Sequence, residues 1–112
     1  MKLTEARDRI AVLLGWQRQQ GDKAGPLGWR HERWDHYLWM IDHPIPYTLD
    51  AIAALWEKHC KGWRIEINVS ATYCRALCEN GELRLFQSST TMIEAWTRLL
   101  LAVLEVQHET KV

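Results

Sequence analysis

Residues 48 to 70 read TLDAIAALWEKHCKGWRIEINVS, and two different apolar periods meet within them. In the first half, apolar residues recur at steps of three and four. This predicts an amphipathic helix that is capped by Thr48 and stops at Gly62. From Trp63 to Ser70 apolar and polar residues alternate, which predicts a β-strand with one buried face. A helix followed directly by such a strand indicates an α+β protein.

The sequence that follows, TYCRALCENGELRLFQS at 72–88, predicts a β-hairpin. Asn80 and Gly81 can supply the positive φ angles of a two-residue turn, and in that register Cys78 lies opposite Leu83. A capping box at 91–94 then begins a last helix to about residue 108. The expected fold is an antiparallel sheet of three or four strands packed with helices in an α-β-α sandwich, with a helix–strand–strand–strand–helix core.

The rest of the chain is expected to complete one α+β domain over residues 1–112. A helix is predicted at 4–14, capped by Thr4 and ended by Gly15. Glycines and a proline between 15 and 27 predict a loop. The domain is therefore divided into an N-terminal helix at 4–14, an aromatic-rich segment at 28–47 and the α-β-β-β-α core at 48–108.

Aromatic residues are concentrated in GWRHERWDHYLW at 28–39, which holds three tryptophans. In YLWMI at 37–41, successive side chains of an extended segment would point to opposite sides, with Tyr37, Trp39 and Ile41 on one side. This predicts an additional strand with Trp39 in the core. Trp29 and Trp34 are flanked by charged residues and are predicted to be exposed, as interface anchors are. The equal alternative is that all seven tryptophans belong to the core. The candidate partner- or ligand-binding residues are Trp29, Arg30, His31, Arg33, Trp34 and Tyr47.

Charge and cysteine content narrow the function classes. Fourteen basic and fourteen acidic residues cancel, which argues against broad binding to nucleic acid. Cys60, Cys74 and Cys78 are an odd number in a chain with a good core, which is not typical of a secreted disulfide framework. The longest apolar run, LLLAV at 99–103, is far too short to cross a bilayer. We expect a reduced, cytoplasmic protein with no membrane partner.

No motif predicts an enzyme, a metal site or a cofactor. His31 and His36 are five residues apart, which places them neither on one helix face nor on one strand side. Glycine-rich phosphate loops and nucleophile motifs are absent from the sequence. The helix–three strands–helix order is that of double-stranded RNA-binding domains, but the last helix begins TTMIEAW without a basic residue. RNA binding is therefore only the weaker alternative.

Four stretches carry a resemblance to a known family: LLGW at 13–16, PYTLDAIAALWE at 46–57, GWRIEI at 62–67 and AWTRLLLAVLE at 95–105. Together they resemble the phage ABA-sandwich domain, a family of small phage and prophage proteins. The resemblance covers most of the chain and implies an α-β-α layered fold and a phage or prophage origin, hence the cytoplasm of a bacterial host. It implies no catalytic residues.

Two function hypotheses follow. The first is a non-enzymatic phage or prophage accessory protein that binds a host or phage protein stoichiometrically, for example to inhibit a bacterial defence system. The second is a sponge for a small, nucleotide-like molecule, in which Trp29, Trp34 and Tyr47 stack on a base and Arg30 or Arg33 contacts a phosphate. The second predicts a concave pocket instead of a flat patch. A homodimer is compatible with either.

Overall fold

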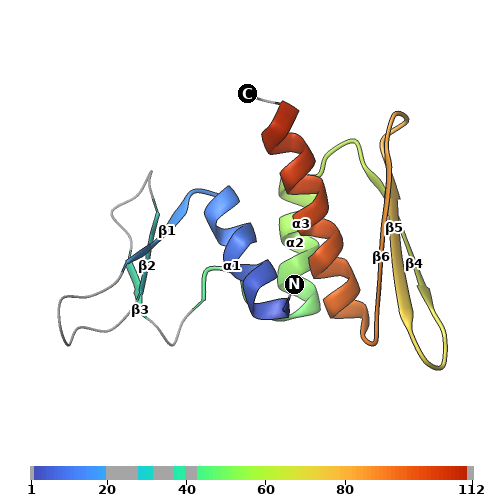
Figure 1. Cartoon of the computed structure of the whole chain (residues 1–112), viewed down its shortest axis with the longest axis horizontal. Coiled ribbons are helices and arrows are strands. Elements are labelled where there is room, and N and C mark those ends of the chain that lie inside the picture. Colours follow the sequence, from blue (N-terminus) through green and yellow to red (C-terminus); the bar gives the residue numbers. More distant parts are fainter. Residues whose placement is uncertain (1, 20–27, 32–36, 40–42, 111–112) are drawn as a thin grey trace.

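A computed structural model of the chain describes residues 2–19, 28–31, 37–39 and 43–110. It confirms the α+β class, with helices and antiparallel sheets in one fold (Figure 1). The elements in chain order are α1 (Leu3–Leu13), β1 (Trp16–Gln19), β2 (Gly28–His31), β3 (Tyr37–Trp39), α2 (Leu49–His59), β4 (Arg64–Val69), β5 (Cys74–Glu79), β6 (Arg84–Ser89) and α3 (Met92–Thr110).

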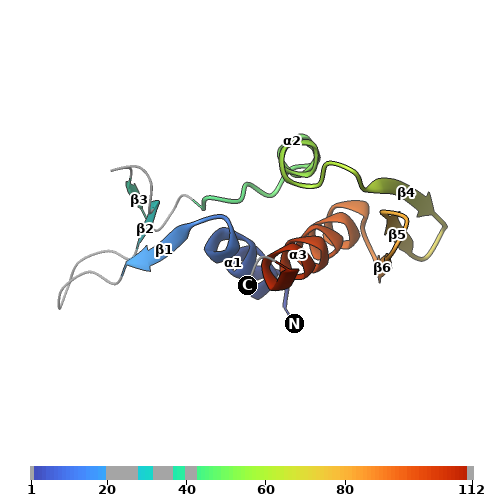
Figure 2. The same cartoon turned by 90° about the horizontal axis from the view of Figure 1, so that it is seen from above.

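The described helices lie between two sheets. One sheet has the order β1-β2-β3 and the other β4-β5-β6, and both are antiparallel. Figures 1 and 2 show the sheets at opposite ends of the long axis of the molecule, with α1, α2 and α3 between them. The strand predicted in the aromatic segment pairs with β2 and therefore does not extend β4–β6. The layers run sheet, helices, sheet, where the sequence predicted one sheet between helices.

The sheet β1–β3, which we call the small sheet, shows that the prediction of a loop throughout 15–27 is wrong. Trp16–Gln19 form β1 and pair with Gly28–His31, so that Trp16 lies opposite His31. Four residues with alternating Trp, Gln and Arg side chains are too few to show a strand period, and their partner strand follows only later in the sequence. Residues 20–27 lie outside the described part of the chain.

The helix boundaries follow the predicted caps in two of three cases. The Thr48 hydroxyl accepts a hydrogen bond from the Ala51 backbone N–H at 3.2 Å, and the Thr91 hydroxyl accepts one from Glu94 at 3.3 Å. The predicted Thr4 cap is wrong, because α1 begins at Leu3 and Lys2 holds the N-cap position. Gly15 ends α1 as predicted, with a φ of 98°.

The hairpin between β5 and β6 has a longer loop than the predicted two-residue turn. Cys78 lies opposite Leu85 instead of Leu83. The Asn80 side-chain oxygen accepts hydrogen bonds from the backbone N–H groups of Glu82 at 2.9 Å and Leu83 at 2.8 Å, which closes the loop. Because the register differs by two residues, every side chain keeps its predicted face. Cys74, Ala76 and Cys78 are buried against the helices.

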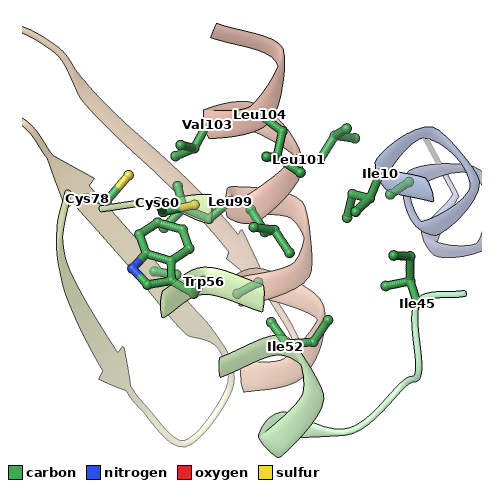
Figure 3. Packing of buried hydrophobic residues seen from close by; sticks show 14 of the residues in the cluster. Ile10, Ile45, Ile52, Trp56, Cys60, Cys78, Leu99, Leu101, Val103 and Leu104 are labelled. Carbon is green, nitrogen blue, oxygen red and sulfur yellow. The ribbon is translucent and has the colours of Figure 1, made fainter. Parts of the chain in front are cut away.

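The core is built around α3. Figure 3 shows Trp56, Cys60 and Cys78 on one side of this helix, and Ile10 and Ile45 on the other. The most completely buried α3 side chains are Leu99, Leu100 and Val103. A helix that is covered on several sides carries apolar residues around much of its circumference, as this one does. Ile45 belongs to this core with Ile10, so the segment at 43–47 packs against α1.

Candidate functional site

The predicted exposure of Trp29 is wrong, because only 5% of this residue is accessible to solvent. Trp29 and His31 are two apart in β2 and therefore share one face of the sheet. That face is turned toward the helices and buries both residues, while Arg30 between them is exposed. Tyr47 is exposed as well. Arg33 and Trp34, like the side chain of Trp39, lie outside the described part of the chain.

His43 connects the buried Trp29 to α1. The two rings are 5.3 Å apart between centroids, and the Arg18 guanidinium lies 5.9 Å from the Trp29 ring. The His43 Nε2 donates to the Asp8 carboxylate at 2.8 Å, and Nδ1 accepts from the Ile45 N–H at 3.0 Å. A His–Asp pair can serve as a general base only if the second ring nitrogen faces a substrate. Here the backbone occupies that nitrogen, so the pair is structural.

Arg7, next to Asp8 in α1, holds the same segment. Its Nη2 and Nε donate to the Ile45 carbonyl at 2.6 and 3.1 Å. The guanidinium also lies 5.5 Å from the centre of the Tyr47 ring. Residues 43–47 therefore bind to α1 through both hydrogen bonds and ring contacts. This places Pro44 and Ile45 as one wall of the cavity described next.

The three helices run in the same direction, and their C-terminal ends lie at one end of the molecule (Figure 1). A cavity of about 460 Å³ opens between these ends, the small sheet and the segment at 43–47. We call it the helix-end cavity. Small-molecule sites in proteins range from about 300 to about 1,000 Å³. The lining residues are Leu13, Leu14, Gly15, Trp16, His31, Pro44, Ile45, Leu55, Lys58, His59, Leu104, Gln107 and His108.

Apolar and basic side chains share this lining. Leucines from all three helices, with Trp16 and Ile45, supply the apolar part. Lys58 and His59 come from the last turn of α2, and His108 from the last turn of α3. None of the lining residues in the described chain is acidic. The cavity thus combines an apolar wall with one ammonium group and several imidazoles.

Side chains that line the cavity donate hydrogen bonds to backbone carbonyls at two of the helix ends. His31 Nε2 lies 3.1 Å from the Leu14 carbonyl just after α1, so this nitrogen carries the hydrogen. The His31 ring also meets Trp16 edge-on at 5.1 Å. Gln107 donates to the His59 carbonyl at the end of α2, at 3.0 Å. These bonds satisfy terminal carbonyls that α1 and α2 cannot satisfy themselves.

The basic residues offset the negative ends of three parallel helix dipoles. Each helix places a partial negative charge at its C-terminus, and cations in the last turn are stabilising there. Part of the charge of Lys58, and of His108 when it is protonated, is therefore balanced by the helices. The helix ends thus weaken the attraction of Lys58 for an anion, so the cavity suits one negative charge better than several.

Sequence reasoning identified only His31 among the residues of this cavity. Lys58, His59, Gln107 and His108 belong to two helix ends that are about fifty residues apart in the chain. Basic residues in a last helical turn are usually explained by the helix dipole, so they carry no signal for a ligand. Only the parallel arrangement of the helices brings them together.

Two of the buried cysteines, Cys60 and Cys78, are poor nucleophiles. Burial raises the pKa of Cys60 to about 12, with a further increase from nearby Cys78. Burial also raises the pKa of Cys78 to about 11, although the Leu85 backbone partly opposes the shift. Both thiols are therefore protonated at neutral pH, and a protonated thiol is a poor nucleophile.

The comparisons with known proteins found no matching family model, no matching curated protein and no matching solved structure. Within residues 2–19, 28–31, 37–39 and 43–110, no three His, Cys, Asp or Glu side chains come together as metal ligands. In those same ranges, none of the helices has the length and apolar character needed to cross a membrane. The helix-end cavity is therefore the feature of the described chain that bears on function.

Proposed function

We propose that the protein captures a small molecule with an apolar body and one anionic end in the helix-end cavity. The observation that carries this proposal is a concave site of ligand size with an apolar wall, a basic edge and no acidic lining residue in the described chain. It develops the second hypothesis from the sequence, which required a concave pocket. Binding itself is the activity that we propose.

The lining residues support one ligand class. The apolar body would lie against Leu13, Leu55 and Leu104, which come from three different helices. Burial of apolar surface contributes about 25 cal/mol for each Å² removed from water. The anionic end would lie near Lys58 and His108 at the basic edge. A carboxylate or sulfonate fits this single ammonium group.

A nucleotide fits less well than the sequence suggested. Trp29 is buried against His43 and Arg18, so its faces are not available to a base. Trp16 lines the cavity, but His31 contacts it edge-on. One lysine beside three negative helix ends also provides little for the several charges of a polyphosphate. We therefore propose a monoanionic amphiphile as the ligand class.

The test uses 8-anilinonaphthalene-1-sulfonate, a fluorescent aromatic sulfonate, with decanoate as the competitor. Lys58→Glu reverses the ammonium group in the cavity, whereas Lys61→Glu makes the same change just beyond α2 and outside the lining. We expect the Kd of the probe to rise at least ~10-fold in Lys58→Glu and to stay within ~2-fold in Lys61→Glu. Decanoate should displace the probe. Equal affinity in both variants, or no binding by the native protein, would refute the proposal.

Binding to a host or phage protein is the second candidate, and the exposure of Arg30 and Tyr47 favours it. Arginine and tyrosine are typical of residues that dominate binding energy at interfaces. Such a phage or prophage accessory protein would act in the bacterial cytoplasm, for example against a defence system. A pull-down from bacterial lysate tests this: one specific protein should bind the native chain and be lost with Arg30→Ala and Tyr47→Ala. Equal capture by native and variant chains would exclude these residues as the contact.

A further inference from the structure

The side of the β4–β6 sheet that faces away from the helices carries an ordered pattern of charges. We call it the outer sheet face. The inner face packs on α3, and Figure 2 shows the described helices on that one side only. The outer sheet face consists of Arg64, Glu66, Asn68, Arg75, Leu77, Glu79, Arg84, Phe86 and Ser88.

The strand register arranges these nine residues in three rows across the sheet. The first row is Arg64, Glu79 and Arg84; the second is Glu66, Leu77 and Phe86; the third is Asn68, Arg75 and Ser88. Phe86 is 57% exposed, and the Arg75 guanidinium lies 4.9 Å from its ring centre. The middle row is thus partly apolar, with Arg75 on one side of Leu77 and Glu79 on the other.

We propose that the outer sheet face binds a second copy of the chain, with a two-fold axis that crosses the strands at the Leu77 row. Two sheets that pack face to face keep their strands roughly aligned. This axis places the first row of one copy over the third row of the other. Glu79 then faces Arg75 of the second copy, twice by symmetry. Leu77 and Phe86 face their own counterparts.

The charges select this axis over the other aligned arrangement. A two-fold axis parallel to the strands would keep each row over itself and place β4 over β6. Arg64 would then face Arg84 of the second copy, and both Arg75 and Glu79 would face their own counterparts. Like charges in direct opposition across an interface disfavour the arrangement. The axis across the strands avoids these three contacts.

One like-charged contact remains in the proposed arrangement. Glu66 in the middle row faces its own counterpart, although it lies on the edge strand β4, where water reaches it. Glu66 and Glu79 therefore have opposite roles: one weakens the dimer and the other stabilises it. Within one chain Glu79 also lies 4.0 Å from Arg84, an exposed pair that contributes little to stability.

The size of the outer sheet face indicates a dissociable dimer. Stable interfaces of standard size use about 20–30 residues from each partner. Nine residues on a six-residue-long, three-stranded sheet are fewer than half of that number. We therefore expect a dissociation constant in the range of ~1 to ~100 µM.

The first experiment is sedimentation velocity from about 1 to about 500 µM. The matched pair is Glu79→Gln and Glu66→Gln, which make the same change on the same face. We expect Glu79→Gln to raise the dimer Kd at least ~3-fold and Glu66→Gln to lower it. All changed residues are exposed, and thermal unfolding checks that each variant is folded.

A charge exchange provides the second measurement. Arg75→Glu alone and Glu79→Arg alone should each raise the Kd at least ~10-fold, and the double variant should return it to within ~3-fold of native. A native chain that is monomeric at every concentration would overturn the proposal. So would a dimer with the same Kd in all variants, which would indicate pairing elsewhere, such as at a strand edge. A double variant without recovery would overturn the proposed axis.

Discussion

Replacement of Trp29 by alanine should destabilise the protein strongly, because the structure places this residue in the core. Only 5% of Trp29 is exposed. A buried tryptophan removes about 150–250 Å² from water, which corresponds to ~4–6 kcal/mol at ~25 cal/mol per Å². Two of its contacts, Arg18 and His43, are polar and reduce this value. We expect a loss of about 3–5 kcal/mol, as in other large-to-small changes of buried aromatic residues.

Urea unfolding followed by far-UV circular dichroism measures this loss. The matched control is Arg30→Ala in the same strand, where the exposed side chain predicts a change within ~0.5 kcal/mol. In a thermal melt, the 112-residue chain should lose about 4 °C for each kcal/mol. Trp29→Ala should therefore melt ~12–20 °C lower. A loss below ~1 kcal/mol with an unchanged slope in urea would show that Trp29 is a surface residue, as the sequence suggested.

Three further predictions concern other contacts. His43→Ala should cost about 1–3 kcal/mol of unfolding free energy in urea, since hydrogen bonds to Asp8 and Ile45 are lost; an unchanged value would mean that the pair does not hold the 43–47 segment. Thr48→Ala should cost about 1 kcal/mol in the same assay and Thr48→Gly only a few tenths, and an unchanged stability of Thr48→Ala would argue against a capping role. The raised pKa values of Cys60 and Cys78, about 12 and about 11 against an ordinary 9.0, mean that the folded chain holds these protons more tightly. Their contribution to stability should be complete below pH 9.0 and be lost toward pH 11 and 12, and a Cys60→Ala, Cys78→Ala chain should lose less stability over that range.

The sequence predicted the half of the fold that has strong local signals. The helix–strand junction at 48–70 and the last helix have clear apolar periods, and the structure has α2, β4 and α3 there. The hairpin register was off by two residues, because Asn80 closes a longer loop through its side chain instead of forming a two-residue turn. Side-chain hydrogen bonds of this kind are not visible in an apolar pattern.

Sequence patterns did not predict the small sheet or the burial of Trp29, and the cause is different. Charged neighbours in the sequence made Trp29 look exposed, but in a strand the immediate neighbours lie on the opposite face. The residues that cover Trp29 are Arg18 and His43, both distant in sequence. The position of a strand face relative to the rest of the chain is a tertiary property, and no local pattern determines it.

The cavity follows from the same tertiary arrangement, and this explains why basic residues gather there. Parallel helices bring three negative ends together, an arrangement that is unfavourable unless cations or donors offset it. His31 and Gln107 donate to two of the end carbonyls, and Lys58 adds a full positive charge. Stability alone would be served equally if these groups filled the space between the helices. Instead they border a cavity of about 460 Å³ with an apolar wall. A bulkier side chain, as in Leu55→Trp, should fill the cavity and therefore abolish probe binding at little cost in stability. Unchanged probe binding in Leu55→Trp would show that the probe binds elsewhere.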